Sequence, residues 1–189
     1  MGRPKEALVL GDNTLLGRAV DTLLGCTSPV VIVARDKRQG LPPVNPEAET
    51  AFDEELDEGP LVGLLAGLRA IGPRCEAVFV TGCDSPFLSA RSVDWLARQL
   101  GDHQAVIPRV DHRLQPLAAI YRTSILPDVE AMVRDGIRTP RTIAERCDTR
   151  ILTDTEIDAF DPERRFLQNV NNPDDYQSIL SQVDPQSDA

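Results

Sequence analysis

The sequence predicts a doubly wound, three-layer α/β domain with a mostly parallel sheet, and three observations favour it. Short runs rich in Val, Ile and Phe alternate along the chain with segments whose apolar residues recur at helical spacing. Several of these runs are apolar throughout, which is typical of strands covered on both faces. The 189 residues suffice for a core of this kind in one domain. We therefore expect one domain over residues 1–183 and a frayed tail over residues 184–189.

The first half of the chain supplies two expected strands and two expected helices. Thr14 is a candidate N-cap for a helix that continues to Leu24, with apolar residues at helical spacing. Residues 29–34 are expected to form a buried strand, and residues 50–52 a short one. Residues 59–70 open with Gly and Pro, which suit the entry and the first position of a helix.

The second half continues the same alternation. The expected elements, in order, are a helix over residues 89–100, strands over 105–108 and 115–122, helices over 128–134 and 142–147, a strand that runs from residue 166 into a turn, and a last helix over 174–183. Asn172 or Asp174 is expected to cap this last helix.

A further strand is expected between the helix over residues 59–70 and the helix over residues 89–100, and it points to a function. Residues 78–80 predict a buried parallel strand, and the run stops at Asp84, with Pro86 two residues later. Open α/β sheets bind ligands at the carboxyl ends of their strands. A carboxylate at that edge is a good Mg²⁺ ligand when phosphates share the metal. The alternative is that Asp84 only caps the helix that starts near Ser89.

Composition narrows the classes of function. Acidic residues outnumber basic ones by 30 to 20, which argues against nucleic-acid binding through a basic surface. No apolar run approaches the roughly 18 residues of a membrane span, and no signal-peptide pattern opens the chain, so no membrane contact is expected. The four cysteines are far apart, which argues against disulfides or a zinc site and fits a reducing cytoplasm. The only histidines, His103 and His112, lie in polar segments, which disfavours a Ser-His-Asp hydrolase.

Before this strand, Asp53 allows two interpretations, and so does the pair Gly63 and Gly67. Asp53 belongs to an acidic run over residues 47–58, which predicts a solvated loop, but it also follows the short strand and so could lie on a sheet edge. Gly63 and Gly67 share one helix face. That face either packs closely on the sheet, or belongs to a helix whose N-terminus faces a ligand's phosphate or base.

A basic region spans residues 134–150 and contains five arginines against three acids. We expect a solvated helix face, because most surface charge is structural. The alternative is an anion site at Gly136-Ile137-Arg138, since arginine binds phosphate through its planar fork.

Four short segments occur in a specific order: Met1–Lys5, Asp53 with Gly59–Gly63, Cys83–Leu88 and Asn169–Asp175. Segments Gln115–Ala119 and Gly136–Arg138 are weaker signals. Together they cover nearly the whole chain and resemble the molybdenum cofactor guanylyltransferase family. That resemblance implies a Rossmann-like fold of the nucleotide-diphospho-sugar transferase type. The patterns Gly-Pro-Leu-x-Gly, Cys-Asp-x-Pro and Asn-Val-Asn favour guanylyltransferases over their cytidylyltransferase relatives.

The resemblance implies transfer of GMP from GTP to the phosphate of molybdopterin cofactor, with release of pyrophosphate. It implies that Lys5 neutralises phosphate charge and that Asp84 holds Mg²⁺. The implied GTP-binding residues are Arg3, Lys5, Asp53, Gly59, Pro60, Leu61 and Asp84, and those on the molybdopterin side are Gln115, Asn169 and Asn171. Other proteins of molybdenum cofactor biosynthesis, or molybdoenzymes, are implied as partners. The attacking phosphate oxygen is already ionised at neutral pH, so no general base is needed, which fits the scarcity of histidine.

The sequence departs from the family pattern at its start. The family begins with a strand and a glycine-rich loop, Leu-Ala-Gly-Gly-x-Ser-x-Arg, and the printed sequence starts at the Met that follows them. A start codon assigned too late, a shortened protein, or a non-catalytic member of the family would each explain this. Because that strand is central in the family, its loss is expected to expose the edges of two neighbouring strands.

Two other functions therefore stand beside guanylyl transfer. One is a binding protein that keeps the pterin side and has lost GTP turnover. The other is a related nucleotidyltransferase that uses CTP or a sugar phosphate.

Overall fold

A computed structural model describes residues 4–35, 37–52 and 59–183. Its helices are α1 (Leu15–Leu24), α2 (Pro60–Ile71), α3 (Ala90–Gln99), α4 (Leu126–Arg134), α5 (Ile143–Arg146), α6 (Asp154–Phe160) and α7 (Pro173–Val183). Its strands are β1 (Val9–Leu10), β2 (Asn13–Thr14), β3 (Val31–Ala34), β4 (Glu49–Phe52), β5 (Ala77–Thr81), β6 (Ala105–Val110), β7 (Arg113–Leu114), β8 (Ala118–Arg122) and β9 (Thr149–Leu152). Among these helices, none is long and apolar enough to cross a membrane.

The larger sheet is mixed, with one direction prevailing. Its order is β5-β8-β6, with β7 and β9 also paired to β6. Strand β8 runs antiparallel to both β5 and β6, and β9 runs parallel to β6. Strands β5, β6 and β9 therefore share one direction. The α/β fold is confirmed, but the expectation that the strand before Asp84 pairs in parallel is wrong for its described neighbour.

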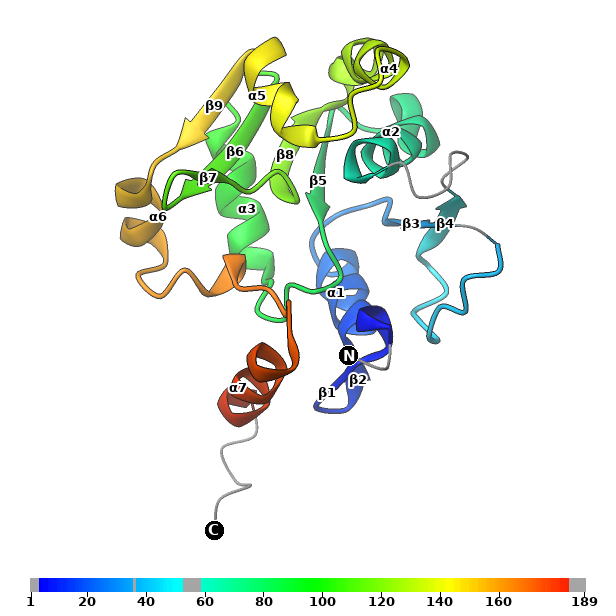
Figure 1. Cartoon of the computed structure of the whole chain (residues 1–189), viewed down its shortest axis with the longest axis vertical. Helices are drawn as coiled ribbons and strands as arrows, with labels where there is room; N and C mark the ends of the chain where they lie inside the picture. The colour runs from blue at the N-terminus through cyan, green and yellow to red at the C-terminus, as the bar shows by residue number, and fades with distance from the viewer. Residues whose placement is uncertain (1–3, 36, 53–58, 184–189) are drawn as a thin grey trace.

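Helices cover both faces of this sheet, which gives three layers (Figure 1). Side chains of successive strand residues point to opposite faces. Ala105 and Ile107 belong to the core under α2 and α4, whereas Val106 belongs to the core under α3 and α6. The expected doubly wound arrangement follows from this alternation, because each face carries enough apolar surface to need a helix layer.

A second, smaller sheet consists of β3 and β4, which pair in parallel. On one side, Leu16 and Val20 of α1 pack against Ile32. On the other side α2 approaches closely, since a Cβ placed on Gly67 would lie 3.2 Å from Val33 Cγ2. The packing interpretation of this glycine is therefore confirmed, whereas Gly63 has open space beside it.

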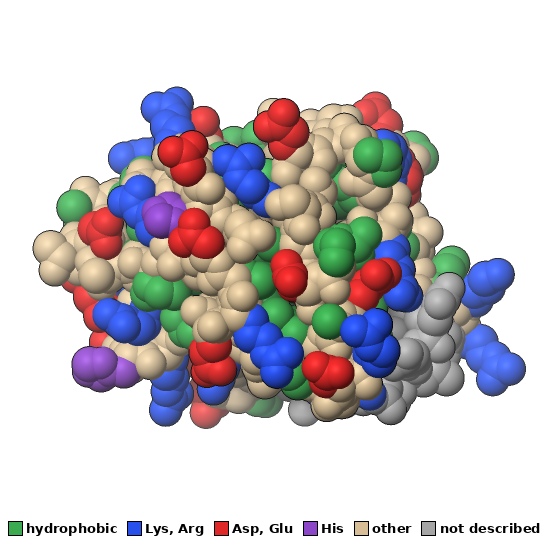
Figure 2. Space-filling model, turned by 90° about the horizontal axis from the view of Figure 1, so that it is seen from above, with side chains coloured by type: hydrophobic (Ala, Val, Ile, Leu, Met, Phe, Trp, Pro, Cys, Tyr) green, Lys and Arg blue, Asp and Glu red, His purple; other side chains and the backbone are tan. Residues whose placement is uncertain are grey.

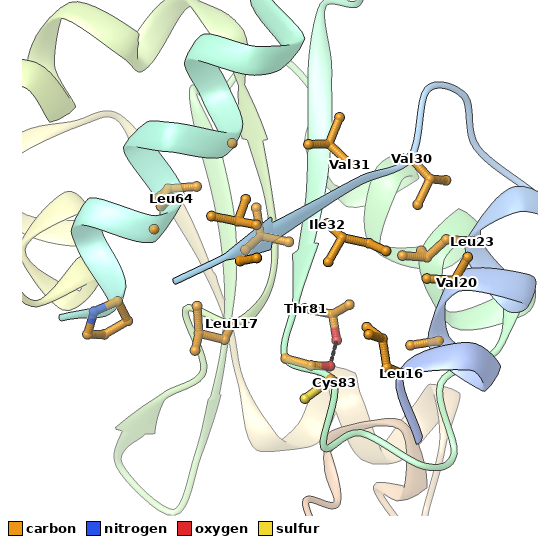
Figure 3. Close-up of a pocket in the computed structure, with 18 of the residues that line it drawn as sticks. Leu16, Val20, Leu23, Val30, Val31, Ile32, Leu64, Thr81, Cys83 and Leu117 are labelled. Carbon is orange, nitrogen blue, oxygen red and sulfur yellow. Dashed lines mark hydrogen bonds between the residues drawn. The ribbon is translucent and has the colours of Figure 1, made fainter. Parts of the chain in front are cut away.

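In the part of the chain that the structure describes, the β3-β4 sheet and the larger sheet are separate. No strand pairing among the described residues links β3 to β5, and a cavity of about 540 Å³ lies between them. Residues of β3, β5, α1 and α2 line it, as Figure 3 shows. Of the five residues of β5, only Val78 is buried. Among the described residues β5 thus pairs along one edge only, with β8, and this explains why an apolar strand is only half buried.

The expected cap of the first helix is present, but the strand expected near the C-terminus is not. Thr14 caps α1 by accepting a hydrogen bond from the Gly17 N–H at 3.1 Å, as expected. The strand expected from residue 166 is wrong: Arg165–Leu167 form a 3₁₀ turn, η5. Phe166 packs edge-on against Trp95 and Phe160, and this aromatic cluster stabilises a turn that apolar content alone does not distinguish from a strand. The structure also contains β9 and α6, which were not among the expected elements.

Candidate functional site

Asp84 lies just beyond the carboxyl end of β5, next to a lysine from the other end of the chain. Lys5, in the 3₁₀ turn η1 (Lys5–Ala7), places its Nζ 3.1 Å from Asp84 Oδ2. The Lys5 and Asp84 side chains are 36% and 24% exposed, so both remain within reach of a ligand. The capping alternative for Asp84 is wrong, because Ser89 caps α3 itself and forms a capping box with Ser92.

The loop before α7 meets the same strand end. The Val170 N–H donates to the Asp84 carbonyl oxygen at 2.8 Å, and Val170 is fully buried. The Ser85 hydroxyl lies 3.0 Å from Asn169 Oδ1, and Lys5 Nζ lies 3.4 Å from Asn171 Oδ1. Four residues implied by family likeness, Lys5, Asp84, Asn169 and Asn171, are therefore brought together from three distant parts of the chain.

The start of α7 fixes this loop. Asn172 Oδ1 accepts a hydrogen bond from the Asp175 N–H at 2.9 Å, which confirms Asn172 as the cap. Asp175 Oδ2 accepts from the backbone N–H groups of Asn171 and Asn172, at 2.8 and 3.1 Å. The Tyr176 hydroxyl donates to the Val9 carbonyl oxygen, which ties α7 to β1. The asparagine loop is thus held from both ends.

The turn that carries Lys5 is held by the loop after β3. Gln39 Nε2 donates to Glu6 Oε1 at 2.8 Å, and Gln39 Oε1 accepts from the Arg35 N–H at 2.8 Å. Glu6 and Gln39 also line the cavity between β3 and β5. Glu6, Gln39 and Ser85 were not among the expected site residues. Ser85 lies within the segment Cys83–Leu88, and Glu6 directly follows Lys5, so their positions in the chain were the available signal.

The start of α2 forms another wall of this cavity. Gly59 and Pro60 line it. Gly59 has φ 99°, and a Cβ there would lie 3.0 Å from the Arg138 carbonyl oxygen, so glycine is required on both counts. Leu61 is fully buried, and its N–H donates to Arg138 O at 3.1 Å. In this conformation Leu61 therefore anchors the helix start and offers neither side chain nor N–H to a ligand.

The other implied residues are placed as follows. Gln115 precedes β8, whose Ala118 pairs with Thr81 at the end of β5, so register brings Gln115 to the same end of the sheet as Asp84. Gln115 Nε2 donates to the Arg113 carbonyl oxygen at 3.4 Å. Arg3 and Asp53 lie outside the described residues.

The basic region before β9 has a structural role. Arg138 Nη1 donates to the Val133 and Ile137 carbonyl oxygens at 2.8 and 3.2 Å, near the end of α4. Arg146 lies 3.6 Å from Asp135, and Arg150 lies 3.1 Å from Glu156. Figure 2, which looks down on the molecule from above, shows basic and acidic side chains interspersed over this face. These contacts favour the expected solvated surface over an anion site.

Burial and neighbouring charges favour a neutral thiol at Cys83, next to Asp84. Burial, followed by the charges of Asp84 and Glu6, raises the pKa of Cys83 to about 11. Cys83 is therefore protonated at neutral pH and does not act as a nucleophile.

No group of three or more His, Cys, Asp or Glu side chains suited to a metal ion occurs within the described residues. One partly exposed carboxylate fits Mg²⁺ that arrives with phosphate oxygens and water, but not a metal held by protein ligands alone.

Comparison with known proteins identifies the family. Residues 1–150 match the MobA-like NTP transferase domain. The chain belongs to this family. It is thereby a nucleotidyltransferase, and the resemblance that its motifs indicated is confirmed.

Three relatives of this nucleotidyltransferase illustrate the likeness. A "Probable molybdenum cofactor guanylyltransferase" of Methanosarcina mazei is 32% identical over 190 residues, covering 95% of this chain and 84% of the relative. The solved structure of molybdopterin-guanine dinucleotide biosynthesis protein A from Archaeoglobus fulgidus superposes with a TM-score of 0.79 at 24% identity, covering 98% of this chain and 93% of that one. A Mycobacterium tuberculosis protein solved in complex with manganese gives a TM-score of 0.65 at 14% identity, covering 95% and 93% of the two chains. The two structural likenesses support the fold alone.

Proposed function

We propose that this nucleotidyltransferase transfers GMP from GTP to the phosphate of molybdopterin cofactor and releases pyrophosphate. The observation that carries the proposal is the meeting of Lys5, Asp84, Asn169 and Asn171 at the carboxyl end of β5. This is the edge at which an open α/β sheet binds its ligands. The names of curated relatives such as the Methanosarcina mazei protein favour GTP over CTP.

The reaction needs positioning and charge neutralisation more than proton transfer. An oxygen of the acceptor's phosphate attacks the α-phosphorus of GTP, and the bond from that phosphorus to the departing pyrophosphate breaks. The attacking oxygen is already ionised at neutral pH, so the site needs no base. Lys5 Nζ, now 3.1 Å from Asp84, moves its charge onto the triphosphate when the nucleotide binds.

Asp84 is the residue that would hold Mg²⁺. A bound Mg²⁺ would neutralise charge on the phosphates that share it. Manganese in a solved structure of the same fold is consistent with a divalent cation here. On the nucleotide side, Gly59 and Pro60 would contact the guanosine, together with Asp53 and Arg3, which lie outside the described residues.

Asn169, Asn171 and Gln115 would face the pterin. Amide groups can donate and accept hydrogen bonds, which suits a heterocycle that carries both kinds of group. Asn169 and Asn171 lie on the loop bonded to the Asp84 carbonyl, so an acceptor held there would reach the phosphates at Asp84. We expect the enzyme in the cytoplasm, with other proteins of molybdenum cofactor biosynthesis or molybdoenzymes as partners.

A transfer assay tests this proposal. GTP and CTP, each radiolabelled at the α-phosphate, are incubated with Mg²⁺, molybdopterin cofactor and the protein, and labelled dinucleotide is separated from nucleotide. We expect GMP transfer at a rate at least about tenfold above CMP transfer, since one base-specific contact is worth about that factor. The same assay is run on a version extended at the N-terminus with a strand and a Gly-Gly-x-Ser-x-Arg loop.

The outcomes separate the three candidate functions. GMP transfer by either version supports the guanylyltransferase. Preferential CMP transfer assigns the chain to the cytidylyl relatives. No transfer by either version, together with binding of the pterin, identifies a non-catalytic binding protein.

A further inference from the structure

Ser85 is one of only two polar residues with buried side chains among the described residues, and its burial calls for an explanation. It is 6% exposed and lies in the loop directly after Asp84. The other is Ser92, which the capping box of α3 accounts for. A buried hydroxyl is costly unless it is hydrogen-bonded, so its partner indicates its role.

The partner of Ser85 is the side chain of Asn169. Ser85 Oγ lies 3.0 Å from Asn169 Oδ1 and 3.5 Å from Thr81 Oγ1. An amide oxygen can only accept, so the Ser85 hydroxyl donates to Asn169. This bond fixes which end of the Asn169 amide points inward.

The neighbouring asparagine is oriented in the same way. Lys5 Nζ carries only donors, so Asn171 Oδ1 accepts from it at 3.4 Å. Neither Asn169 Nδ2 nor Asn171 Nδ2 has a hydrogen-bond partner in the described part of the chain, and neither is a buried unsatisfied atom there. Both NH₂ groups are therefore available to a ligand, whereas each amide oxygen already accepts one hydrogen bond within the protein.

We propose that Ser85 is a positioning residue that turns the NH₂ group of Asn169 toward the acceptor substrate. The proposal rests on the function proposed above. On this substrate the site recognises an oxygen atom that accepts hydrogen bonds, in a phosphate or carbonyl group. The reason is that the site offers only donors there, two NH₂ groups and an ammonium group. Ser85 thus acts through Asn169 and does not touch the substrate itself.

Steady-state kinetics with GTP, Mg²⁺ and molybdopterin cofactor test the role of Ser85. In Ser85→Ala, we expect the KM for the acceptor to rise about five- to tenfold, as for the loss of one neutral hydrogen bond. The KM for GTP and kcat should stay within about twofold, because the nucleotide side is untouched. Ser124→Ala, at an exposed serine in the turn Thr123–Ile125, is the matched control and should leave all constants unchanged.

Substitutions of Asn169 test the orientation of its side-chain amide directly. If the NH₂ faces the acceptor, Asn169→Asp places a carboxylate oxygen against the acceptor's oxygen, and acceptor binding should fall about tenfold further than in Asn169→Ala. In the Ser85→Ala background this difference should shrink, because the side chain is no longer held. Asn169→Asp that binds the acceptor as well as wild type would overturn the proposal.

A readout without turnover separates this proposal from the proposed function. In Ser85→Ala, the NMR chemical shift of the Asn169 side-chain carbonyl carbon should move upfield, since that oxygen loses its donor. An unchanged shift, or an unchanged acceptor KM in an active enzyme, contradicts the role of Ser85. Wild-type protein that transfers no GMP, with the expected NMR shift present, contradicts the proposed reaction and leaves the orientation of Asn169 intact.

Discussion

Replacing Asp84 with alanine abolishes turnover with GTP and Mg²⁺ but leaves the fold intact. We expect kcat to fall by at least about a hundredfold to a thousandfold, the range for losing one group that stabilises transition-state charge. The carboxylate is the one acidic group at this strand end that the structure describes within hydrogen-bonding distance of Lys5. Without this carboxylate, the Mg²⁺ that would neutralise the phosphate charge loses its protein ligand.

The stability of this variant should change little. The Lys5–Asp84 pair is partly exposed, and such pairs contribute about 0–1 kcal/mol. The bond from the Val170 N–H to the Asp84 carbonyl uses backbone only and persists in alanine. We expect the melting temperature to fall by less than about 3 °C. Asp102→Ala, at an exposed aspartate, is the control; near-normal turnover by Asp84→Ala would reject the assignment.

An extended apolar segment grafted ahead of Met1 should insert between β3 and β5. The cavity of about 540 Å³ is lined by both strands and by α1 and α2, so a central strand would find apolar contacts above and below (Figure 3). Each fully buried Val or Ile contributes about 1.5–3 kcal/mol, against about 1–2 kcal/mol for ordering each backbone residue. For five residues with their new backbone hydrogen bonds, we expect a net gain of about 2–5 kcal/mol. That gain raises the melting temperature by about 5–15 °C.

A matched graft isolates the backbone contribution. The same extension with two residues changed to proline loses N–H donors and should give little or no stabilisation. Amide hydrogen exchange in β3 and β5 should slow only with the unmodified graft, because only that graft pairs with their edges. Equal exchange and equal melting temperatures for both extensions would show that the cavity does not accept a strand.

Local patterns predicted most of the elements of this fold. Thr14 and Asn172 each cap the helix that their side chains indicated, because capping depends on residues within one turn. The 3₁₀ turn at Phe166 was mistaken for a strand because Phe166 packs against Phe160, six residues earlier, and against Trp95, which is distant in the sequence. The antiparallel pairing of β5 with β8 is likewise a tertiary choice that apolar content does not encode.

The candidate site was predictable in part. Family likeness selected Lys5, Asp84, Asn169 and Asn171, which the fold brings together. It also selected Leu61, which is buried and holds the helix start to Arg138. Spacing cannot distinguish a residue that contacts a ligand from one that packs beside it.

We expect Asp84 to hold a divalent cation and Lys5 to contact the phosphates of the same GTP molecule. The most direct measurement is Mn²⁺ binding followed by electron paramagnetic resonance, with and without GTP, in wild type, Asp84→Ala and Asp102→Ala. We predict weak Mn²⁺ binding alone, since one carboxylate is a poor site, and at least about tenfold tighter binding with GTP. That enhancement should vanish in Asp84→Ala and persist in Asp102→Ala. Equal enhancement in all three proteins would contradict the account.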